Sequence, residues 1–416
     1  MANHIIHRVN LELEAPDQQS ARVFHDRASW ILKNDILPAL ENYLDSLGWE
    51  EEFLRLNELN INIDILRKEQ IETELTNMVM AQIRELLDKK SRDNNGLKKD
   101  NSRQLSREEK IFETFLHFLL TGRLPWWSSA VDTEKYFASL PELFRTPNKT
   151  WQQRLKELVK NYPRAIHRLL LQFPEKTLVA AIFYILPDEQ QSQPAIRNEI
   201  RQAIRRYSKD GSLSLAGISF APLQQIQKQT ATVEEKSSET LHHTSEEEEE
   251  GLFTRHAGLV LLHPFLESFL GEPGWVKNGM FISTEARIQA AHLLAYMVTG
   301  EENLMEHEMI LEKYLCGINL EEPVPSVVPL DETMKQECEK LLNAVIKHWK
   351  VLKNTSPAGL REAFLKREGK LLITESQHQL IVEHKSTDIL LGRLPWGYQV
   401  IKLPWMPVPL LVEWTH

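Results

Sequence analysis

The chain has 416 residues, 42% of them apolar, which is enough for about two or three domains with hydrophobic cores. Its only cysteines, Cys316 and Cys338, cannot hold a chain of this length together as a disulfide scaffold, so a reducing compartment such as the cytoplasm is expected. The net charge is −10, and residues 224–250 contribute −6 of it through eight Glu and two Lys. The remainder offers no clustered Lys/Arg footprint for nucleic acid.

No segment predicts export or insertion into a membrane. The first residues lack the basic patch, apolar stretch and small-residue cleavage site of a secretory signal. The longest apolar run, Leu178–Leu186, is about half of the ~18 residues that a membrane span requires. We therefore expect a cytoplasmic protein without a membrane partner.

Residues 1–90 alternate between strand and helix patterns. Apolar residues recur at nearly every second position in 5–13 and again in 54–65, which predicts two strands that could pair. Helical spacing follows each of them, over 21–47 and through Leu87. This predicts a small N-terminal β-α-β-α unit, followed by a polar linker over 91–105.

A helical domain is predicted over 106–222. Ser106 and Glu109 form a capping box, in which each side chain satisfies an unpaired amide of the first helical turn. The apolar stripe that follows ends at Gly122, the expected left-handed helix stop. Several short helices cut by proline continue the domain. Residues 223–251 are too polar and too acidic to bury a face, which predicts a disordered linker.

Residues 252–416 are predicted to be helical again and to end in strands. Helical patterns cover 252–270, 283–299, 307–315, 332–352 and a segment that begins near Pro357 and stops at Gly369. LLITESQHQLIVEH reads as a β-hairpin, and a Pro/Trp-rich end with two short strands follows. The predicted fold class is therefore α+β, mainly α.

The sequence contains no motif that predicts catalysis. There is no GxxxxGK[ST], GxGxxG, GxSxG or HExxH. Histidines were considered as metal ligands, namely His256 with His263 on one helix face, His292, and His307 between two glutamates. A metal site needs three or four convergent ligands, and no third ligand has suitable local spacing. We predict no catalytic residue, no cofactor and no metal.

The most unusual motif is GRLPW, which occurs at 122–126 and at 392–396, with KLPW at 402–405. As a structural element, Gly ends a helix, Pro prevents its continuation and Trp fills a gap in the core. As a binding element, large rigid aromatic residues beside a cation are typical of interface hot spots. The structural interpretation is favoured at the first copy. At the two C-terminal copies the structural and binding interpretations are nearly equally supported. The candidate partner-binding residues are Arg123, Trp126, Trp127, Arg393, Trp396, Lys402, Trp405 and Trp414.

Several long segments resemble the tape measure proteins of contractile injection systems, the phage-tail-like particles in which a sheath contracts around a rigid tube. The segments are IIHRVNLELE with ILPALENYLD, TGRLPWW, LLHPFL, AHLLAYMVTGEE, EHEMILEKYLCGINLEEPVP, HWKVLKNTSPAGLREAFLKREGKL and LPWGYQVIKLPWMPVPLLVEW. The resemblance covers both ends of the chain and implies no catalytic residue.

The resemblance implies an assembly protein that contacts tube, baseplate or spike proteins, lies within the tube of the assembled particle and sets its length, with self-association as a further option. Rulers of this kind carry a long variable middle, whereas the middle here has only about 30 residues. Fully helical, it would span ~45 Å. A short end-binding assembly factor is therefore an alternative, and an uncharacterised hydrolase or metal enzyme is a weaker one.

Overall fold

The computed structural model describes residues 27–47, 53–56, 59–63, 74–92, 102–128, 130–185, 251–374 and 377–414, together with five single positions at 6, 9, 12, 198 and 202. Two compact units are present. Unit 1 comprises Met1–Phe115 and Pro125–Ala138, and unit 2 comprises Leu116–Leu124 and Ser139–His416. Three predicted segments lie mostly or wholly outside the described residues, namely the strand at 5–13, the end of the helical domain beyond residue 185, and the acidic linker up to residue 250.

Unit 1 is built on two helices that pack through apolar side chains. A π-helical turn, η1 (Leu32–Ile36), continues into α2 (Leu37–Ser46), and α4 (Leu75–Arg92) supplies Met80, Ile83 and Leu87 to a small core with α2. Ile31, Ile36 and Leu75 form a second cluster. Both helices were predicted from their apolar spacing.

The strands of unit 1 differ from the prediction. β1 (Phe53–Leu56) overlaps the start of the strand predicted over 54–65, and its partner is β2 (Ser102–Leu105) in an antiparallel pair. Residues 102–105 had been assigned to the polar linker because SRQL carries no alternating apolar pattern. The antiparallel pairing therefore extends ordered structure into the predicted linker.

The helices from residue 107 onward begin and end near their predicted positions. α5 (Arg107–Thr121) starts with the predicted capping box, since Glu109 N donates to Ser106 Oγ at 3.1 Å and Ser106 N donates to Glu109 Oε2 at 3.0 Å. The short helices that follow it in the chain are α6 (Ala130–Leu143), α7 (Lys149–Asn161), α8 (Pro163–Gln172) and α9 (Glu175–Ile185).

The first segment of the 252–416 region was wrongly predicted as one helix. Leu252–Thr254 forms strand β3, and the helical part is divided into the 3-10 helix η4 (Ala257–Leu262) and α13 (His263–Gly271). η4 packs closely against the backbone at residues 364–365, and Gly258 makes this possible, because a Cβ there would lie 2.6 Å from the Cα of Leu365. A three-residue strand is too short to leave a period-two signal.

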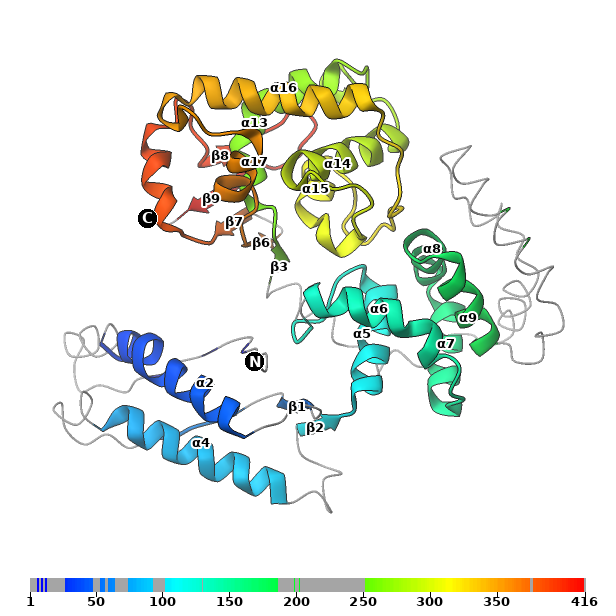
Figure 1. Ribbon diagram of the computed structural model, residues 1–416, viewed down its shortest axis with the longest axis vertical. Helices are drawn as coiled ribbons and strands as arrows, with labels where there is room; N and C mark the ends of the chain where they lie inside the picture. The colour runs from blue at the N-terminus through cyan, green and yellow to red at the C-terminus, as the bar shows by residue number, and fades with distance from the viewer. Residues whose placement is uncertain are drawn as a thin grey trace. The chain divides into compact units, whose positions relative to one another are not determined.

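The remaining helices of this region follow the predicted order. The structure contains α14 (Thr284–Thr299), η5 (Glu306–Glu308), α15 (Ile310–Leu315), α16 (Glu332–His348), η6 (Lys350–Leu352), α17 (Pro357–Leu360) and the π-helical η7 (Arg361–Leu365). α16 packs against α14 and α17 (Figure 1). Its buried stripe includes Cys338, Leu342 and Val345, and Cys316 is buried as well.

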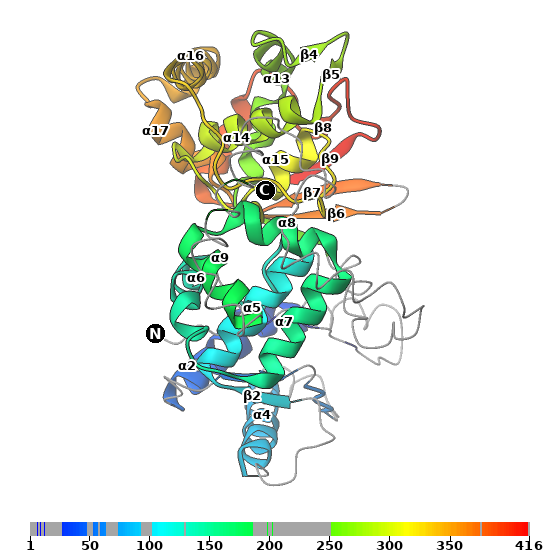
Figure 2. The same ribbon diagram turned by 90° about the vertical axis from the view of Figure 1, so that its right-hand side faces the viewer.

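A five-stranded sheet completes unit 2, with strand order β3-β6-β7-β9-β8. The predicted hairpin is present as β6 (Gly369–Ile373) and β7 (His378–Val382), which lie side by side (Figure 2). β9 (Leu410–Trp414) pairs in parallel with β7 and antiparallel with β8 (Val400–Ile401). A separate hairpin, β4 (Val276–Lys277) with β5 (Met280–Phe281), was not predicted. The fold class is α+β and mainly α, as predicted.

Candidate protein-binding site

The first GRLPW copy ends helix α5 beside a buried ionic cluster. Gly122 has φ +75°, and its N–H donates to Phe118 O at 2.8 Å. A Cβ at this position would lie 2.8 Å from Arg168 Nε and closer still to the carboxylate of Glu306. Position 122 therefore requires glycine for two reasons: the backbone is left-handed, and there is no space for a side chain.

Arg168, Glu306 and Lys313 form the ionic cluster, which we call the buried triad. Their side chains are at most 1% exposed. Glu306 accepts from Arg168 Nε at 3.0 Å and from Lys313 Nζ at 2.7 Å. Burial lowers the pKa of Lys313, and the nearby Glu306 carboxylate opposes that effect. One carboxylate thus serves two cations.

Backbone carbonyls supply the remaining acceptors for the two cations. Arg168 Nη1 donates to Leu119 O at 2.9 Å and to Leu120 O at 2.7 Å, which caps the last turn of α5 where the helix dipole is negative. Lys313 Nζ donates to Leu320 O at 2.9 Å and to Glu322 O at 2.7 Å. The excess positive charge of the triad therefore faces carbonyl oxygens.

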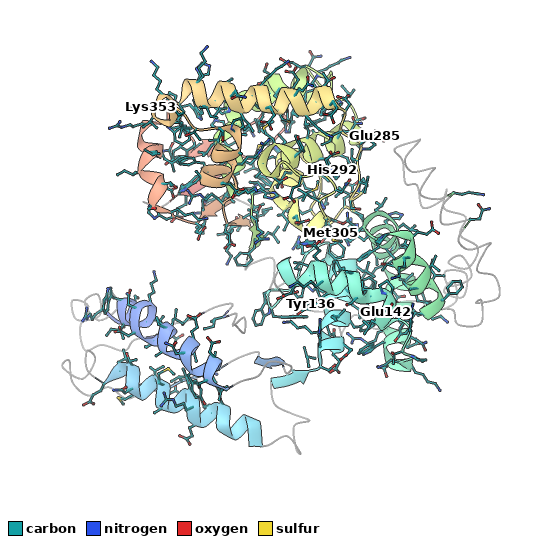
Figure 3. The ribbon with its side chains drawn as sticks, in the orientation of Figure 1. Tyr136, Glu142, Glu285, His292, Met305 and Lys353 are labelled. Atoms are coloured by element: carbon teal, nitrogen blue, oxygen red, sulfur yellow. The ribbon has the colours of Figure 1, made fainter. Side chains whose placement is uncertain are left out.

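The segment 319–326 joins the triad to α8 and α14. Gln172 receives the Glu306 N–H on its Oε1 at 2.9 Å and donates from Nε2 to Val324 O at 2.5 Å. His292, labelled in Figure 3, bonds to Pro325 O through Nε2 at 2.9 Å. Burial lowers the pKa of His292 to about 4, so the ring is neutral at pH 7 and Nε2 donates to the carbonyl.

The three candidate residues of the first copy are half-buried. Arg123 N donates to Thr121 Oγ1 at 3.1 Å, which continues the turn begun by Gly122. Trp126 and Trp127 are each partly exposed. The helix end predicted for this copy is confirmed by the geometry at Gly122, and the partner-binding role of these side chains stays a prediction.

The second copy has the same letters in a different setting. Gly392 is exposed within the 3-10 helix η8 (Ser386–Arg393), and no atom lies within 4 Å of a Cβ built there. Arg393 is exposed, while Trp396 is half-buried and donates from Nε1 to Leu261 O at 2.9 Å. Its ring meets Phe265 edge-on at 5.1 Å between centroids. This tryptophan is tied to the core and still presents part of its ring.

KLPW at 402–405 forms a third, similar anchor. Trp405 Nε1 donates to Leu315 O at 2.7 Å at the end of α15, and its ring lies 4.9 Å from that of Phe281 on β5. Lys402 is exposed, with Nζ donating to Pro407 O at 2.7 Å. The indole is half-buried, as at Trp396.

Trp414 lies in the core rather than on the surface. Only 5% of the residue is exposed, and Nε1 donates to Asp388 Oδ2 at 2.9 Å. Asp388 is itself buried and pairs with Arg367 at 2.6 Å. In this structure Trp414 has no exposed ring to offer to a partner.

The histidines considered as ligands do not converge on a common point. His256 Nδ1 lies 2.6 Å from Glu312 Oε1, and His263 Nδ1 lies 3.1 Å from Val260 O. His307 keeps a buried Nδ1 without a hydrogen-bond partner, and burial lowers its pKa. Within the described part of the chain, no group of three or more His, Cys, Asp or Glu could hold a metal ion.

The β4–β5 hairpin beside Trp405 was missed by sequence reasoning. Its turn residues, Asn278 at φ 52° and Gly279 at φ 71°, have the left-handed backbone of a two-residue hairpin turn. The Asn-Gly pair is the sequence signal that could have revealed it. The two flanking strands have only two residues each, so no alternation marks them.

The candidate site thus consists of turns in which Gly122, Trp396 and Trp405 are joined to neighbouring elements of unit 2 by hydrogen bonds. Comparison with known families identifies the class as a component of contractile injection systems. The model of the contractile injection system tape measure protein family matches residues 3–211 and 219–414, and the chain belongs to this family. No curated protein and no solved structure matches it. None of the helices over the described ranges is long and apolar enough to cross a membrane.

Proposed function

We propose that the chain is a non-enzymatic assembly protein of a contractile injection particle, and that it acts as a compact factor at one end of the tube rather than as a length-spanning rod. Its partners would be tube, baseplate or spike proteins of the same particle. Assembly of that particle would take place in the cytoplasm. Membership of the tape measure family carries the assembly role.

The distribution of folded structure supports the end-binding form of the proposal. Residues from 116–124, 139–185 and 251–414 belong to one compact unit, and the buried triad ties α8 to the segment around Glu306. Among the described residues the longest helix, α4, has 18 residues, or roughly 27 Å at ~1.5 Å per residue. A compact unit built from helices of this length covers little tube length.

The first test is removal of the chain from the particle. Cells that carry the complete particle genes without this one are expected to yield few or no complete tubes by electron microscopy, and the full chain supplied separately restores them. Complete particles of normal number and length without the chain would overturn the assembly role.

A second test separates the end-binding factor from a ruler. Helical inserts of 20 and 40 residues placed within 223–250 are expected to leave the distribution of tube lengths unchanged. A ruler predicts tubes longer by roughly 30 and 60 Å, at ~1.5 Å per inserted residue. A proportional increase would overturn the end-binding proposal and leave the assembly role intact.

A further inference from the structure

The β4–β5 hairpin exposes apolar side chains on the face where polar ones are expected. Val276 and Phe281 pair and point inward, being 9% and 8% exposed. Lys277 pairs with Met280 on the opposite face, and Met280 is 61% exposed. Ile282 continues that face at 55% exposure. Strands with one buried face normally carry polar residues on the other, so this face is unusual for a solvent-exposed surface.

The loop that carries Trp405 lies against this hairpin. A Cβ on Gly279 would lie 2.9 Å from Pro404 Cβ, and the Phe281 and Trp405 rings are in contact. The loop that precedes β9 lies beside β5 (Figure 2). The hydrogen bond of Trp405 to Leu315 O ties the loop to α15, and that of Lys402 to Pro407 O joins two residues of the loop. The apolar surface is therefore already formed before a partner arrives, which lowers the entropy lost on binding.

Three cations lie on the hairpin, beside Phe281 and on the loop that carries Trp405. Lys277 and Lys402 are exposed, and Arg287 places its guanidinium 5.9 Å from the centre of the Phe281 ring. Arg287 Nη1 donates to Gly317 O, a backbone carbonyl. Over the described ranges none of the three cations pairs with an acidic side chain. Their charges remain available to a partner, and they select an acidic one.

We propose that Lys277, Met280 and Ile282, together with Pro404 and Trp405, form a docking surface for an acidic-apolar segment of another particle protein. That segment would place apolar side chains on Met280 and Ile282 and carboxylates beside the cations. This inference rests on the proposed function and names the chemistry of the partner. Trp405 can then have both a structural role and a role at the interface. Its Nε1 donates to Leu315 O, and its ring lies at the edge of the docking surface.

The test uses the full chain with Met280→Asp and Ile282→Asp together, and measures binding to the purified tube, baseplate and spike proteins of the particle one at a time. Both side chains point outward, so the melting temperature is expected to stay within a few degrees of that of the parent. Binding to one particle protein should weaken by at least ~10-fold, because apolar anchors at an interface centre carry much of its affinity. Ile389→Asp is the matched control, since Ile389 is 80% exposed on η8, and it should bind like the parent.

A second variant tests the charge and guards against a folding defect. Lys277→Glu leaves the apolar face intact and is expected to weaken binding to the same protein and to reduce its dependence on salt concentration. Unchanged binding by both variants would overturn the proposal. Loss of self-association in sedimentation, with normal binding to every particle protein, would assign the surface to a second copy of this chain and overturn the proposal as well. If removal of the chain blocks assembly while the Asp variant assembles normally, this surface is wrong and the proposed function stands.

Discussion

The two GRLPW copies have identical letters and different structural roles. Gly122 has a left-handed backbone and faces the Arg168–Glu306 pair, whereas Gly392 is exposed inside a 3-10 helix with open space around it. In both copies Leu-Pro-Trp follows the end of a helix. Whether the glycine before it is essential depends on the atoms that surround that glycine. The repeat is therefore repeated turn chemistry rather than a duplicated site.

The largest effect is expected from breaking the buried triad under the first copy. Glu306→Ala leaves two buried cations without their carboxylate and should lower the free energy of unfolding by about 3–5 kcal/mol. Urea denaturation of the full chain measures this change. Glu362→Ala is the control, because it removes only the exposed pair with Lys366 and should change stability by less than about 1 kcal/mol. Equal effects of the two variants would show that the triad is not a stabilising feature.

The glycines themselves allow the most direct comparison of the two copies. Gly122→Ala meets both an unfavourable backbone and the Glu306 carboxylate, and should destabilise by about 2–4 kcal/mol. Gly392→Ala should be neutral or stabilise by up to about 1 kcal/mol, since alanine restricts the unfolded chain without a clash. Thermal unfolding of both variants beside the parent measures the difference. A destabilisation by Gly392→Ala as large as that by Gly122→Ala would contradict the distinction drawn here.

Acid is expected to lower the free energy of unfolding through His292. This residue bonds to Pro325 O and so holds the segment 319–326, which contacts the buried triad near the first GRLPW copy. The folded pKa of about 4 lies below the unfolded value near 6.5, so its contribution to stability is complete above pH 6.5 and is lost as the pH falls toward 4. The loss should reach at most about 3 kcal/mol at pH 4. His292→Gln removes this titration. Its unfolding free energy should fall less between pH 7 and pH 4 than that of the parent, and parallel curves would refute this role of His292.

The smallest changes are expected at the indole N–H groups of the C-terminal turns. Trp396→Phe and Trp405→Phe keep most of the ring and remove the donors to Leu261 O and Leu315 O. Each should lower the free energy of unfolding by about 1–2 kcal/mol, because a partly buried carbonyl loses its partner. Differential scanning calorimetry of the single variants measures this. No change in either variant would indicate that water replaces the indole.

Local signals predicted the helices well and long-range pairings poorly. The capping box at Ser106, the helix stop at Gly122 and the apolar stripe of α16 each depend on a few neighbouring residues, so they are readable from sequence. β2 and β3 are short, and β3 pairs with β6 more than 100 residues away. Neither leaves a local pattern.

The same limit applied to the candidate site. The tryptophans stood out in the sequence because of their repeated motif, but the hydrogen-bond acceptors of Trp396 and Trp405, Leu261 and Leu315, lie on elements distant in sequence. The buried triad joins Arg168 to Glu306 across 138 positions, and each residue alone resembles an ordinary surface charge. The hairpin at Asn278-Gly279 had a readable turn signal that its very short strands concealed.

The strand order also determines when unit 2 is completed during synthesis. β9 lies between β7 and β8, so the sheet that begins with β3 near residue 252 lacks an internal strand until residue 414 has been made. Chains grow at about 5–20 residues per second, and residues 252–414 therefore take roughly 10–30 s to emerge in order. β7 is complete at residue 382, so for roughly the last 2–6 s of that interval it presents an open edge that can pair with other chains. A nascent chain thus depends on residues 410–414 for protection against misassembly, and a chain that lacks β9 should aggregate rather than form a smaller folded product.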